Sequence, residues 1–436
     1  MWLYFFKLAW ISLRQTPVMS ALMVTAVGIG IAACLVTSTI YLALSENPLS
    51  HKDEVLFAVQ LDAWDPLNAS NGPNDMPKQL TYQDAVALFE SDIPTHAIFM
   101  YKSGFAVRPE NDSIRPFRST ARMTTSDFFQ LFDVPFLFGN AWSEGVDKIS
   151  ERVVVLSKQL NERLFNGENS VGKQIELDGR VFKILGVTDD WHPRPKVHDL
   201  NNGAYNRRDD MYATISIGIE LEMSSWGNTN AWKRETIVTF TDRLKSENTW
   251  FQMWVQLDTK KQIDDFSSFI ENYIRQQKKL GRFERPLHYH LNTPSEWLSK
   301  NNVVRQDNRV LLWLSIIFLL VCLINTIALL LAKFLKKAPS IGVRRALGAS
   351  KKAIFSQHLY ETLMVGIGGG AFGLILSWLG LMGVRYLQPG MKDVAIMHWP
   401  TFIMALCFSL LASLFCGLLP AWKISHTQPA RYLKVQ

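Results

Sequence analysis

Four apolar stretches without charged residues divide this chain unevenly. Each exceeds the roughly 20 residues that a helix needs to cross the hydrocarbon core of a membrane. One lies near the N-terminus and three lie near the C-terminus, with about 260 residues between the first and the second. The stretches are Val18–Leu44, Val310–Ala332, Thr362–Val384 and Val394–Trp422. We therefore predict four transmembrane helices in a 1+3 arrangement, with a large domain inserted between helices 1 and 2.

The charges are distributed in a way that orients these helices. Residues 45–308 contain 31 Lys and Arg against 37 Asp and Glu, whereas the rest of the chain contains 15 against 2. The basic residues outside the large domain lie beside the spans, and the positive-inside rule places such segments in the cytoplasm. They include Lys7 and Arg14; Lys333, Lys336, Lys337, Arg344, Arg345, Lys351 and Lys352; and Lys423, Arg431 and Lys434. We expect both termini in the cytoplasm, the large domain on the other side, and no binding of nucleic acid.

The cysteines indicate the compartment of the large domain. Cys34, Cys322, Cys407 and Cys416 all lie inside the predicted spans, where a thiol acts as a small apolar group. The large domain therefore folds without disulfides, and about 260 residues suffice for a hydrophobic core. These features fit a multi-pass protein of the bacterial inner membrane with its large domain in the periplasm.

Residues 1–16 are crowded with aromatic and apolar side chains, and only Lys7 and Arg14 are charged. This composition predicts an amphipathic elbow helix in the membrane interface, or else an extension of the first span, which is too long for a removable signal peptide. The predicted boundaries are 1–16 for this helix, 17–45 for transmembrane helix 1, 46–308 for the periplasmic domain, 310–333, 354–387 and 394–422 for transmembrane helices 2 to 4, 334–353 for a cytoplasmic loop or helix, and 423–436 for a cytoplasmic tail.

The large domain mixes predicted strands and helices, so the fold class is an α+β membrane protein with a mixed α/β extracytoplasmic domain. Two β-α-β patterns, about 46–110 and 246–292, indicate one subdomain interrupted by an inserted subdomain of about 111–245. The predicted elements of the first pattern are Glu54–Asp62, Tyr82–Ser91 and Ala97–Arg108, and those of the second are Trp250–Leu257, Gln262–Lys278 and Leu287–Leu291. The insertion has predicted strands at Arg115–Met123, Val153–Leu156, Gln174–Val187 and Glu235–Thr241 and a loop at His192–Asn206. A stalk helix at about 293–309 is predicted to lead without a break into the second span.

Two motifs that resemble catalytic or binding sites do not meet the chemical requirements. Gly167–Gln174 has the glycine and lysine spacing of a P-loop. However, Gln174 occupies the position of the Mg²⁺-binding Ser/Thr, and no strand leads into a helix there. We therefore predict a turn before a strand, and no nucleotide-binding domain in this chain. His192, His198, His288 and His290 have no recognised ligand spacing, and we expect surface histidines and no metal site. Motifs of hydrolases are absent from the sequence, and we do not expect an enzyme.

The segment between the second and third spans carries the strongest signal. A run of ten residues, with the polar and glycine-rich positions after it, resembles the signature loop of the MacB/FtsX family of ABC transporter permeases. The run is Ile341, Gly342, Val343, Arg344, Arg345, Ala346, Leu347, Gly348, Ala349 and Ser350, and it is followed by Gln357, Glu361 and Gly366–Gly373. The resemblance extends, in the family's order, to Thr124–Gly139, Val153–Val187 and Leu419–Trp422. Ser340 departs from the Glu that many members carry before the Ile-Gly pair, which leaves open the acidic contact to the motor subunit and a heterodimeric assembly.

The resemblance implies a permease subunit of a MacB-like exporter. ATP hydrolysis in a separate subunit would drive a periplasmic conformational change, called mechanotransmission, and efflux of peptide, antibiotic or lipid-like substrates. The implied protein partners are a cytoplasmic ABC ATPase that binds ATP and Mg²⁺, a second permease subunit in a homo- or heterodimer, a periplasmic adaptor and an outer-membrane exit duct. Membrane lipids would also contact the chain. This chain itself would hold no cofactor. The alternatives are an FtsX-like regulator that activates a cell-wall hydrolase and a lipoprotein-release permease.

The resemblance also assigns roles to residues around the signature loop. Residues 341–350 would couple to the ATPase. Ile341, Leu347 and Ile354 would dock into a groove on the ATPase, while the neighbouring basic residues face acidic groups or lipid headgroups. The alternative is a solvated stretch that only sets the membrane topology.

Two further sets of residues lie in or beside the third span. The small-xxx-small pairs Gly366/Gly370 and Gly369/Gly373 predict close helix packing. Gln357 and Glu361 lie at the cytoplasmic boundary, where Glu361 either snorkels to the interface or pairs with basic residues of the loop; a proton relay would need a second buried acid, and no predicted span contains one.

Overall fold

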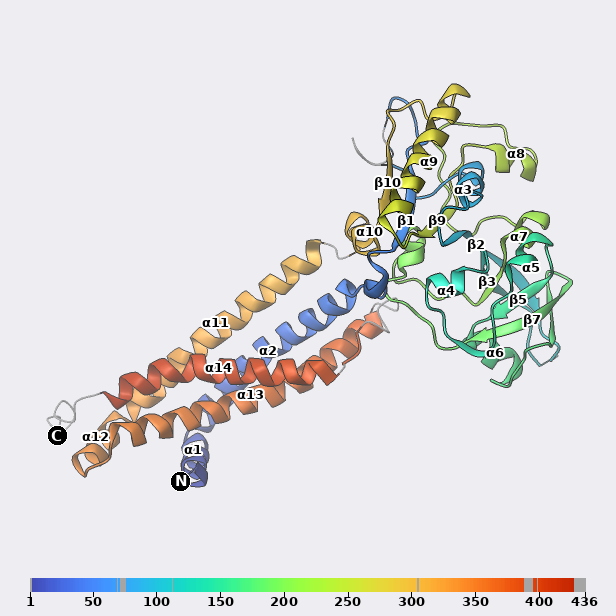
Figure 1. Cartoon of the computed structure of the whole chain (residues 1–436). Coiled ribbons are helices and arrows are strands. Elements are labelled where there is room, and N and C mark those ends of the chain that lie inside the picture. The colour runs from blue at the N-terminus through green and yellow to red at the C-terminus, as the bar shows by residue number, and fades with distance from the viewer. Residues whose placement is uncertain are drawn as a thin grey trace. The chain divides into compact units, whose positions relative to one another are not determined.

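The computed structural model describes residues 2–68, 70, 76–111, 113–303, 306–387, 395–397 and 399–426. Its internal contacts divide the chain into two compact units. The helical domain comprises Met1–Ser45 and Val304–Gln436, and the inter-span domain comprises Glu46–Val303 (Figure 1). The mixed α/β domain that the sequence predicts between the first and second spans is confirmed.

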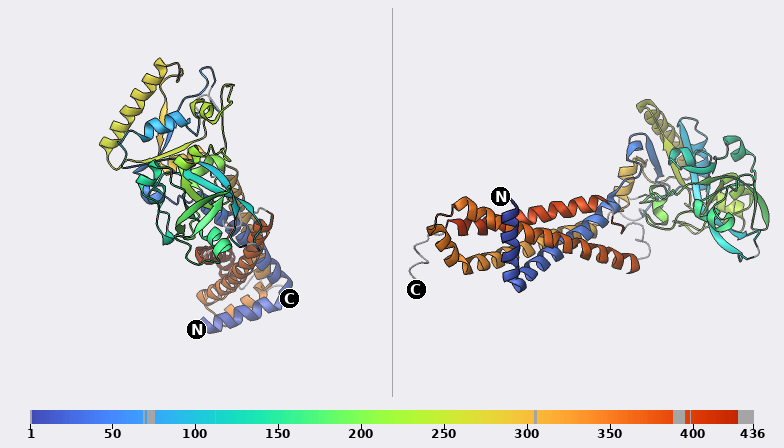
Figure 2. Two further views of the ribbon diagram at one scale, coloured as in Figure 1. Left: turned by 90° about the vertical axis from the view of Figure 1, so that its right-hand side faces the viewer. Right: turned by 90° about the horizontal axis from the view of Figure 1, so that it is seen from below.

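The helical domain contains four helices that are long and apolar enough to cross a membrane. They are α2 (Pro17–Ser45), α11 (Gln306–Lys336), α13 (Lys351–Leu387) and α14 (Trp399–Ser425). The predicted connection between the last two spans and the tail beyond residue 426 lie outside the described residues. The N-terminal helix α1 (Trp2–Gln15) ends before α2 begins at Pro17, a residue suited to the first turn of a helix. It is thus a helix of its own and lies across the long helices (Figure 2).

Helix α13 makes most of its contacts with α2 and α14, and its glycines lie at these contacts. Gly366 and Gly370 face α14: a Cβ on Gly370 would lie 2.7 Å from Ser409 Cβ, and the Ser409 hydroxyl donates a 2.7 Å hydrogen bond to the carbonyl of Gly366. Gly369 and Gly373 face α2, where a Cβ on Gly369 would lie 2.7 Å from Val27 Cγ1. The two pairs thus allow close approach to two different neighbours.

The inter-span domain is built on a ten-stranded sheet with the order β10-β1-β9-β2-β3-β8-β5-β7-β4, and β6 pairs with β2 and β7. The strands are β1 (Leu56–Leu61), β2 (His96–Arg108), β3 (Phe117–Thr124), β4 (Phe136–Gly139), β5 (Val153–Leu156), β6 (Gln174–Leu177), β7 (Arg180–Thr188), β8 (Met211–Thr214), β9 (Gln252–Gln256) and β10 (Tyr289–Asn292). The helices are η1 (Ser50–Lys52), α3 (Tyr82–Phe89), α4 (Phe128–Leu131), α5 (Glu144–Lys148), α6 (Lys158–Phe165), η2 (Val197–Asn202), α7 (Ile215–Glu220), α8 (Phe240–Lys245), α9 (Lys260–Lys279) and α10 (Pro294–Lys300).

Strand β2 belongs to both subdomains. Its first half, from His96 to Met100, pairs with β9 of the interrupted subdomain, and its second half, from Tyr101 to Val107, pairs with β3 of the insertion. The border between the subdomains therefore falls inside this strand and not at about residue 110. Apolar side chains cover both faces of the sheet, with Phe266 of α9 in one cluster and Phe128 of α4 in the other.

Three predicted elements are wrong in detail. The strand predicted over Gln174–Val187 is a hairpin of β6 and β7, because Asp178 and Gly179 adopt positive φ of 48° and 74° and reverse the chain. The strand predicted over Glu235–Thr241 does not form: Thr239 and Asp242 make a capping box that starts α8. The loop predicted over His192–Asn206 contains the short helix η2.

The continuous stalk helix predicted over 293–309 is also wrong. Thr293 caps α10 and accepts a hydrogen bond from the Glu296 backbone N–H, but the helix ends at Lys300. Asn301, Asn302 and Val303 follow in a turn, with Asn302 at a positive φ of 49°. A left-handed residue of this kind ends a helix, so α10 does not continue into α11 as one rod.

Candidate functional site

The predicted coupling segment folds as a helix and a turn. Helix α12 (Ala338–Ala346) has Pro339 in its first turn, where the missing N–H has no helical partner to lose. Gly348 follows with φ of +99°, the conformation that ends many helices. Ser350 then accepts a 3.1 Å hydrogen bond from the Ala353 N–H in the first turn of α13. Residues 341–350 thus connect two helices by a sharp reversal.

The apolar side chains of this segment divide into a buried and an exposed set. Ile341 and Ile354 are 6 % and 3 % exposed and pack with Phe334 inside the helical domain. Leu347 is 82 % exposed and Val343 is 47 % exposed. The prediction that Ile341 and Ile354 dock into a partner is therefore wrong for this conformation, because their surface is already used within the chain. Val343 and Leu347 form the accessible apolar pair.

The arginines of α12 are tied to the neighbouring helices. Arg344 Nη1 donates a 2.9 Å hydrogen bond to the Gln357 Oε1 of α13. Arg345 Nη1 lies 3.4 Å from the carbonyl oxygen of Ser425, at the end of α14. These contacts hold α12 against two of the long helices. They leave Val343 and Leu347, together with the exposed Lys351, on the outer side.

Glu361 is fully buried, so the prediction that it snorkels to the interface is wrong. Its carboxylate pairs with Lys333 Nζ at 2.7 Å, lies 3.4 Å from His358 Nδ1, and accepts a hydrogen bond from the Ser12 hydroxyl. Lys337 Nζ donates a 2.6 Å hydrogen bond to Ser12 Oγ. The cluster joins α1, α11 and α13, and among the described residues no second carboxylate takes part in it. The arrangement fits an ion pair that fixes helices and not a proton relay.

Sequence reasoning did not include Ser12 and His358 in this cluster. His358 precedes Glu361 by three residues on one helix, a spacing that places both side chains on the same face. That signal was present in the sequence. Ser12 carries no such signal, because its position beside Glu361 depends on how α1 packs on α13.

The P-loop-like segment and the histidines occupy structural positions. Gly167–Gln174 connects α6 to β6 and turns at two glycines of positive φ, Gly167 and Gly172. His198 is 2 % exposed, so the expectation of a surface histidine is wrong there. Within the described ranges, no group of three or more His, Cys, Asp or Glu side chains is placed to hold a metal ion.

His198 lies beside a buried ionic cluster around Arg122 of β3. Arg122 Nε donates a 3.1 Å hydrogen bond to Asp209 Oδ2, and its Nη2 donates to Asp199. Burial disfavours the charged form of Arg122, but the two carboxylates outweigh this effect and raise its pKa. Lys196 Nζ lies 3.6 Å from Asp209 Oδ1. The cluster ties the irregular segment around η2 to the central sheet.

Comparisons with known proteins agree with these features. The family described as MacB-like periplasmic core domain matches residues 20–273, and the family described as FtsX-like permease C-terminal matches residues 312–429. A macrolide export ATP-binding/permease protein MacB of Syntrophobacter fumaroxidans is 22% identical over 72% of this chain and 47% of its own length. The uncharacterized ABC transporter permease YvrN of Bacillus subtilis is 22% identical over 71% of this chain and 68% of its own length.

A solved structure, the periplasmic region of MacB from Actinobacillus actinomycetemcomitans, aligns with 60% of this chain and 98% of that structure, at 14% identity and a TM-score of 0.37. The chain spans about half the length of the first MacB relative that it matches. The two family matches together cover the first span, most of the inter-span domain and the three C-terminal spans. The chain therefore belongs to the MacB/FtsX-like family of ABC transporter permeases.

Proposed function

We propose that this chain is the permease subunit of a MacB-like ABC exporter whose ATPase is a separate cytoplasmic subunit. The observation that carries this proposal is the exposed pair Val343 and Leu347 on α12 and the turn after it. An apolar pair on a short helix, flanked by basic residues, can insert into a groove of a partner while the charges face its acidic rim. Leu347 is 82 % exposed and Val343 is 47 % exposed, so both side chains are accessible to a partner.

The proposed cycle transmits motion and does not use a polar pore. ATP and Mg²⁺ are bound by the partner, and closure of the ATPase subunits moves α12. Gln357 and Ser425 receive that movement through Arg344 and Arg345, which hydrogen bond to them. The long helices then shift as packed units and change the inter-span domain by mechanotransmission.

The proposed assembly contains two permease subunits, identical or different, in the bacterial inner membrane. Both termini and α12 lie in the cytoplasm, as the positive-inside rule requires for their basic residues. The inter-span domain lies in the periplasm, where it passes peptide, antibiotic or lipid-like substrates to an adaptor and an outer-membrane duct. The FtsX-like regulator and the lipoprotein-release permease would share this topology and differ in their outer partners.

The test is a mild-detergent affinity purification of the full chain from its native host, with mass spectrometry of the co-purified proteins. The variant Val343→Glu/Leu347→Glu places charges on the proposed contact. The matched control is Leu280→Glu, since Leu280 is 74 % exposed but lies in the inter-span domain. We expect ATPase recovery to fall at least about 10-fold in the double variant, which corresponds to roughly 1.4 kcal/mol of contact free energy, and to stay at the wild-type level in the control.

The co-purified proteins also separate the three functional alternatives. An adaptor and a duct support the exporter, a cell-wall hydrolase supports the regulator, and lipoproteins with a carrier support the release permease. Unchanged ATPase recovery in the double variant would rule out Val343 and Leu347 as the contact. If no ATPase co-purifies and crosslinking through residues 341–350 also fails, the assignment of an ATPase-coupled permease is lost.

A further inference from the structure

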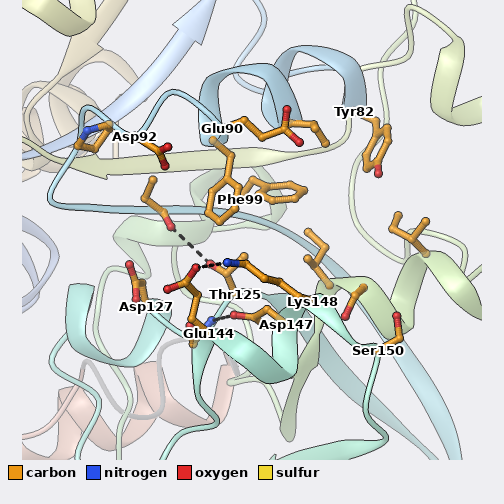
Figure 3. Close-up of a pocket in the computed structure, with 18 of the residues that line it drawn as sticks. Tyr82, Glu90, Asp92, Phe99, Thr125, Asp127, Glu144, Asp147, Lys148 and Ser150 are labelled. Carbon is orange, nitrogen blue, oxygen red and sulfur yellow. Dashed lines mark hydrogen bonds and ion pairs between the residues drawn. The ribbon is translucent and has the colours of Figure 1, made fainter.

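A pocket of about 660 Å³ lies inside the inter-span domain, between its two subdomains. Helix α3, the loop that follows it and the start of β2 form one side, and α5, α7 and the turn after β3 form the other. Figure 3 shows Tyr82, Glu90 and Asp92 across the pocket from Asp127 and Glu144. The volume lies in the range of roughly 300–1,000 Å³ that is typical of sites for small molecules.

The inner surface of this pocket is apolar. Phe89 of α3 and Phe99 of β2 lie with ring centroids 5.0 Å apart, and Figure 3 shows Phe99 between the two sides. Val86 of α3 and Ile215 and Ile219 of α7 extend this apolar surface. A flat or branched hydrocarbon body can be buried on these side chains, which favours binding because apolar surface leaves water.

Acidic residues surround this apolar surface. The carboxyl groups that line the pocket come from Glu90, Asp92, Asp127, Glu144, Asp147 and Glu220. The lining contains one basic side chain, Lys148, whose Nζ is already paired with Glu144 Oε1 at 2.7 Å. The pocket therefore has a large excess of negative charge.

Three of these carboxyl groups already have a partner in the fold. Lys148 holds that of Glu144. Asp127 pairs with His96 Nδ1 at 2.9 Å. Asp147 accepts hydrogen bonds from the Ser126 N–H at 2.8 Å and from Trp142 Nε1 at 2.7 Å, and burial raises its pKa.

The other three acids are exposed and have no such partner. Within the described part of the chain, no side chain or backbone group forms an ion pair or a hydrogen bond with the carboxylates of Glu90, Asp92 or Glu220. Glu90 and Asp92 lie at the C-terminal end of α3, where the helix dipole disfavours negative charge. Their carboxylates are therefore available to contact a cation that comes from outside.

We propose that this pocket binds an amphiphilic organic cation. The apolar body lies against Phe89, Phe99 and Ile219, and the ammonium group lies among Glu90, Asp92 and Glu220. The negative field rejects anions, and a neutral molecule of the same shape gains only the apolar contacts. Aromatic side chains next to the cation add a favourable electrostatic contact. This binding does not depend on the ATPase, and it holds whether the cation is cargo or a signal that controls the transporter.

The test uses the full chain in lipid nanodiscs and fluorescent ligands that share a dansyl group and a five-carbon linker but end in groups of different charge. Dansylcadaverine carries a dansyl group on a five-carbon primary amine, N-pentyl dansylamide is its neutral counterpart, and dansyl-6-aminohexanoate is the anion. The dansyl group reports an apolar environment by its fluorescence. Partition into the lipid is the same for every protein variant, so the difference between variants measures binding to the protein.

The test variant is Glu90→Gln/Asp92→Asn/Glu220→Gln, which keeps shape and removes charge. The matched control is Asp264→Asn/Asp265→Asn/Glu284→Gln, because these acids are also exposed but do not line the pocket. We expect saturable binding of dansylcadaverine to the wild type and the control, and at least about 10-fold weaker binding to the test variant. A second variant, Ser216→Trp, fills the pocket from α7 and should abolish saturable binding without changing any acid.

Each of four results would overturn the proposal. They are the absence of saturable binding to the wild type, equal binding of the neutral and cationic ligands, wild-type affinity in the triple test variant, and wild-type affinity in Ser216→Trp. A loss of ATPase co-purification in the coupling variants has no bearing on this test. The pocket and the proposed function can therefore fail separately.

Discussion

The inter-span domain buries a cation between two carboxylates, whereas the helical domain buries one against a single carboxylate. Arg122 reaches both Asp199 and Asp209, and Lys196 adds a second cation to that cluster. Among the residues that the structure describes, Lys333 has only Glu361 as an anionic partner, with the hydroxyl of Ser20 at 3.4 Å as an additional contact. In the inter-span domain the charges fix an irregular loop to a sheet, and in the helical domain they fix helices to one another.

The two domains also fill their interiors differently. The inter-span domain uses large aromatic side chains such as Trp250, whose ring centroid lies 4.2 Å from that of Phe251. The helical domain uses the absence of side chains, since Gly366 and Gly369 let neighbouring backbones approach. Loss of an aromatic residue leaves a cavity, whereas gain of a methyl group between helices forces them apart.

The largest effect is expected from Arg122→Met. The substitution leaves Asp199 and Asp209 buried without their main cation, which should lower the free energy of unfolding of the inter-span domain by about 3–5 kcal/mol. Pulse proteolysis of the full chain across a denaturant series measures this change. Arg115→Met is the control, because Arg115 is exposed. Equal stability of the two variants would show that the cluster does not hold the domain together.

A smaller effect is expected from Glu361→Gln in the helical domain. Lys333 loses its anionic partner but keeps its contact to the Ser20 hydroxyl, so the free energy of unfolding should fall by roughly 2–3 kcal/mol. Circular dichroism during titration with sodium dodecyl sulfate follows the loss of helix. The additional substitution Lys333→Met should recover part of the loss, because no unpaired charge then remains. A lack of recovery would indicate that Glu361 acts through contacts other than Lys333.

Gly366→Ala tests the packing side of the comparison. The new methyl group would overlap Ser413 Oγ and lie 2.9 Å from the Ser409 carbonyl oxygen, so we expect a loss of about 1–2 kcal/mol, the lower part of the range for overpacking. Gly383→Ala is the control on the same helix, where a Cβ meets no atom within 4 Å and alanine favours the helix. The same titration measures both, and equal losses would show that α13 and α14 are not packed through Gly366.

The smallest effect concerns the pH dependence of the inter-span domain. Burial lowers the pKa of His198, and the nearby positive charges of Arg122 and Lys196 lower it further. The carboxylate of Asp209 acts in the opposite direction but does not outweigh them. The unfolded chain therefore binds a proton that the folded chain does not, so stability falls as the pH drops through the unfolded value of about 6.5. We expect a loss of roughly 1 kcal/mol between pH 6.5 and 5.5.

The variant His198→Phe removes this group and keeps an aromatic ring in its place. Thermal unfolding of wild type and variant at both pH values gives the contribution of His198 as a difference, since all other histidines are common to the two proteins. A wild-type loss equal to that of the variant would mean that His198 binds its proton equally well in the folded and the unfolded chain.

The spans and most strands follow from local patterns in the sequence, and the errors have local causes too. The Asp178-Gly179 pair is a hairpin signal inside the predicted strand Gln174–Val187. Thr239 and Asp242 are a capping box, and they prevail over the apolar pair Ile237-Val238, which ends up 40 % and 81 % exposed. Both signals are present in the sequence, and each overrides the apolar pattern around it.

The candidate site was predictable in position and not in orientation. The motif identifies residues 341–350, but which apolar side chain faces outward depends on Phe334 and on the long helices against which α12 packs. The pocket was not predictable, because Glu90, Asp127 and Glu220 are far apart in the sequence and meet only through the pairing of β2 with two different strands. No local pattern contains that information.

The glycine faces of α13 have a kinematic consequence. Side chains that interlock resist both turning and sliding of a helix, whereas a face of glycines offers little resistance to displacement along the helix axis. Phe372 of α13 already lies beside Gly28 of α2, where a Cβ would be only 2.6 Å from its ring, so rotation of α13 about its axis would drive this ring against the backbone of α2. If the proposed cycle moves α13, we therefore expect translation along its axis between α2 and α14.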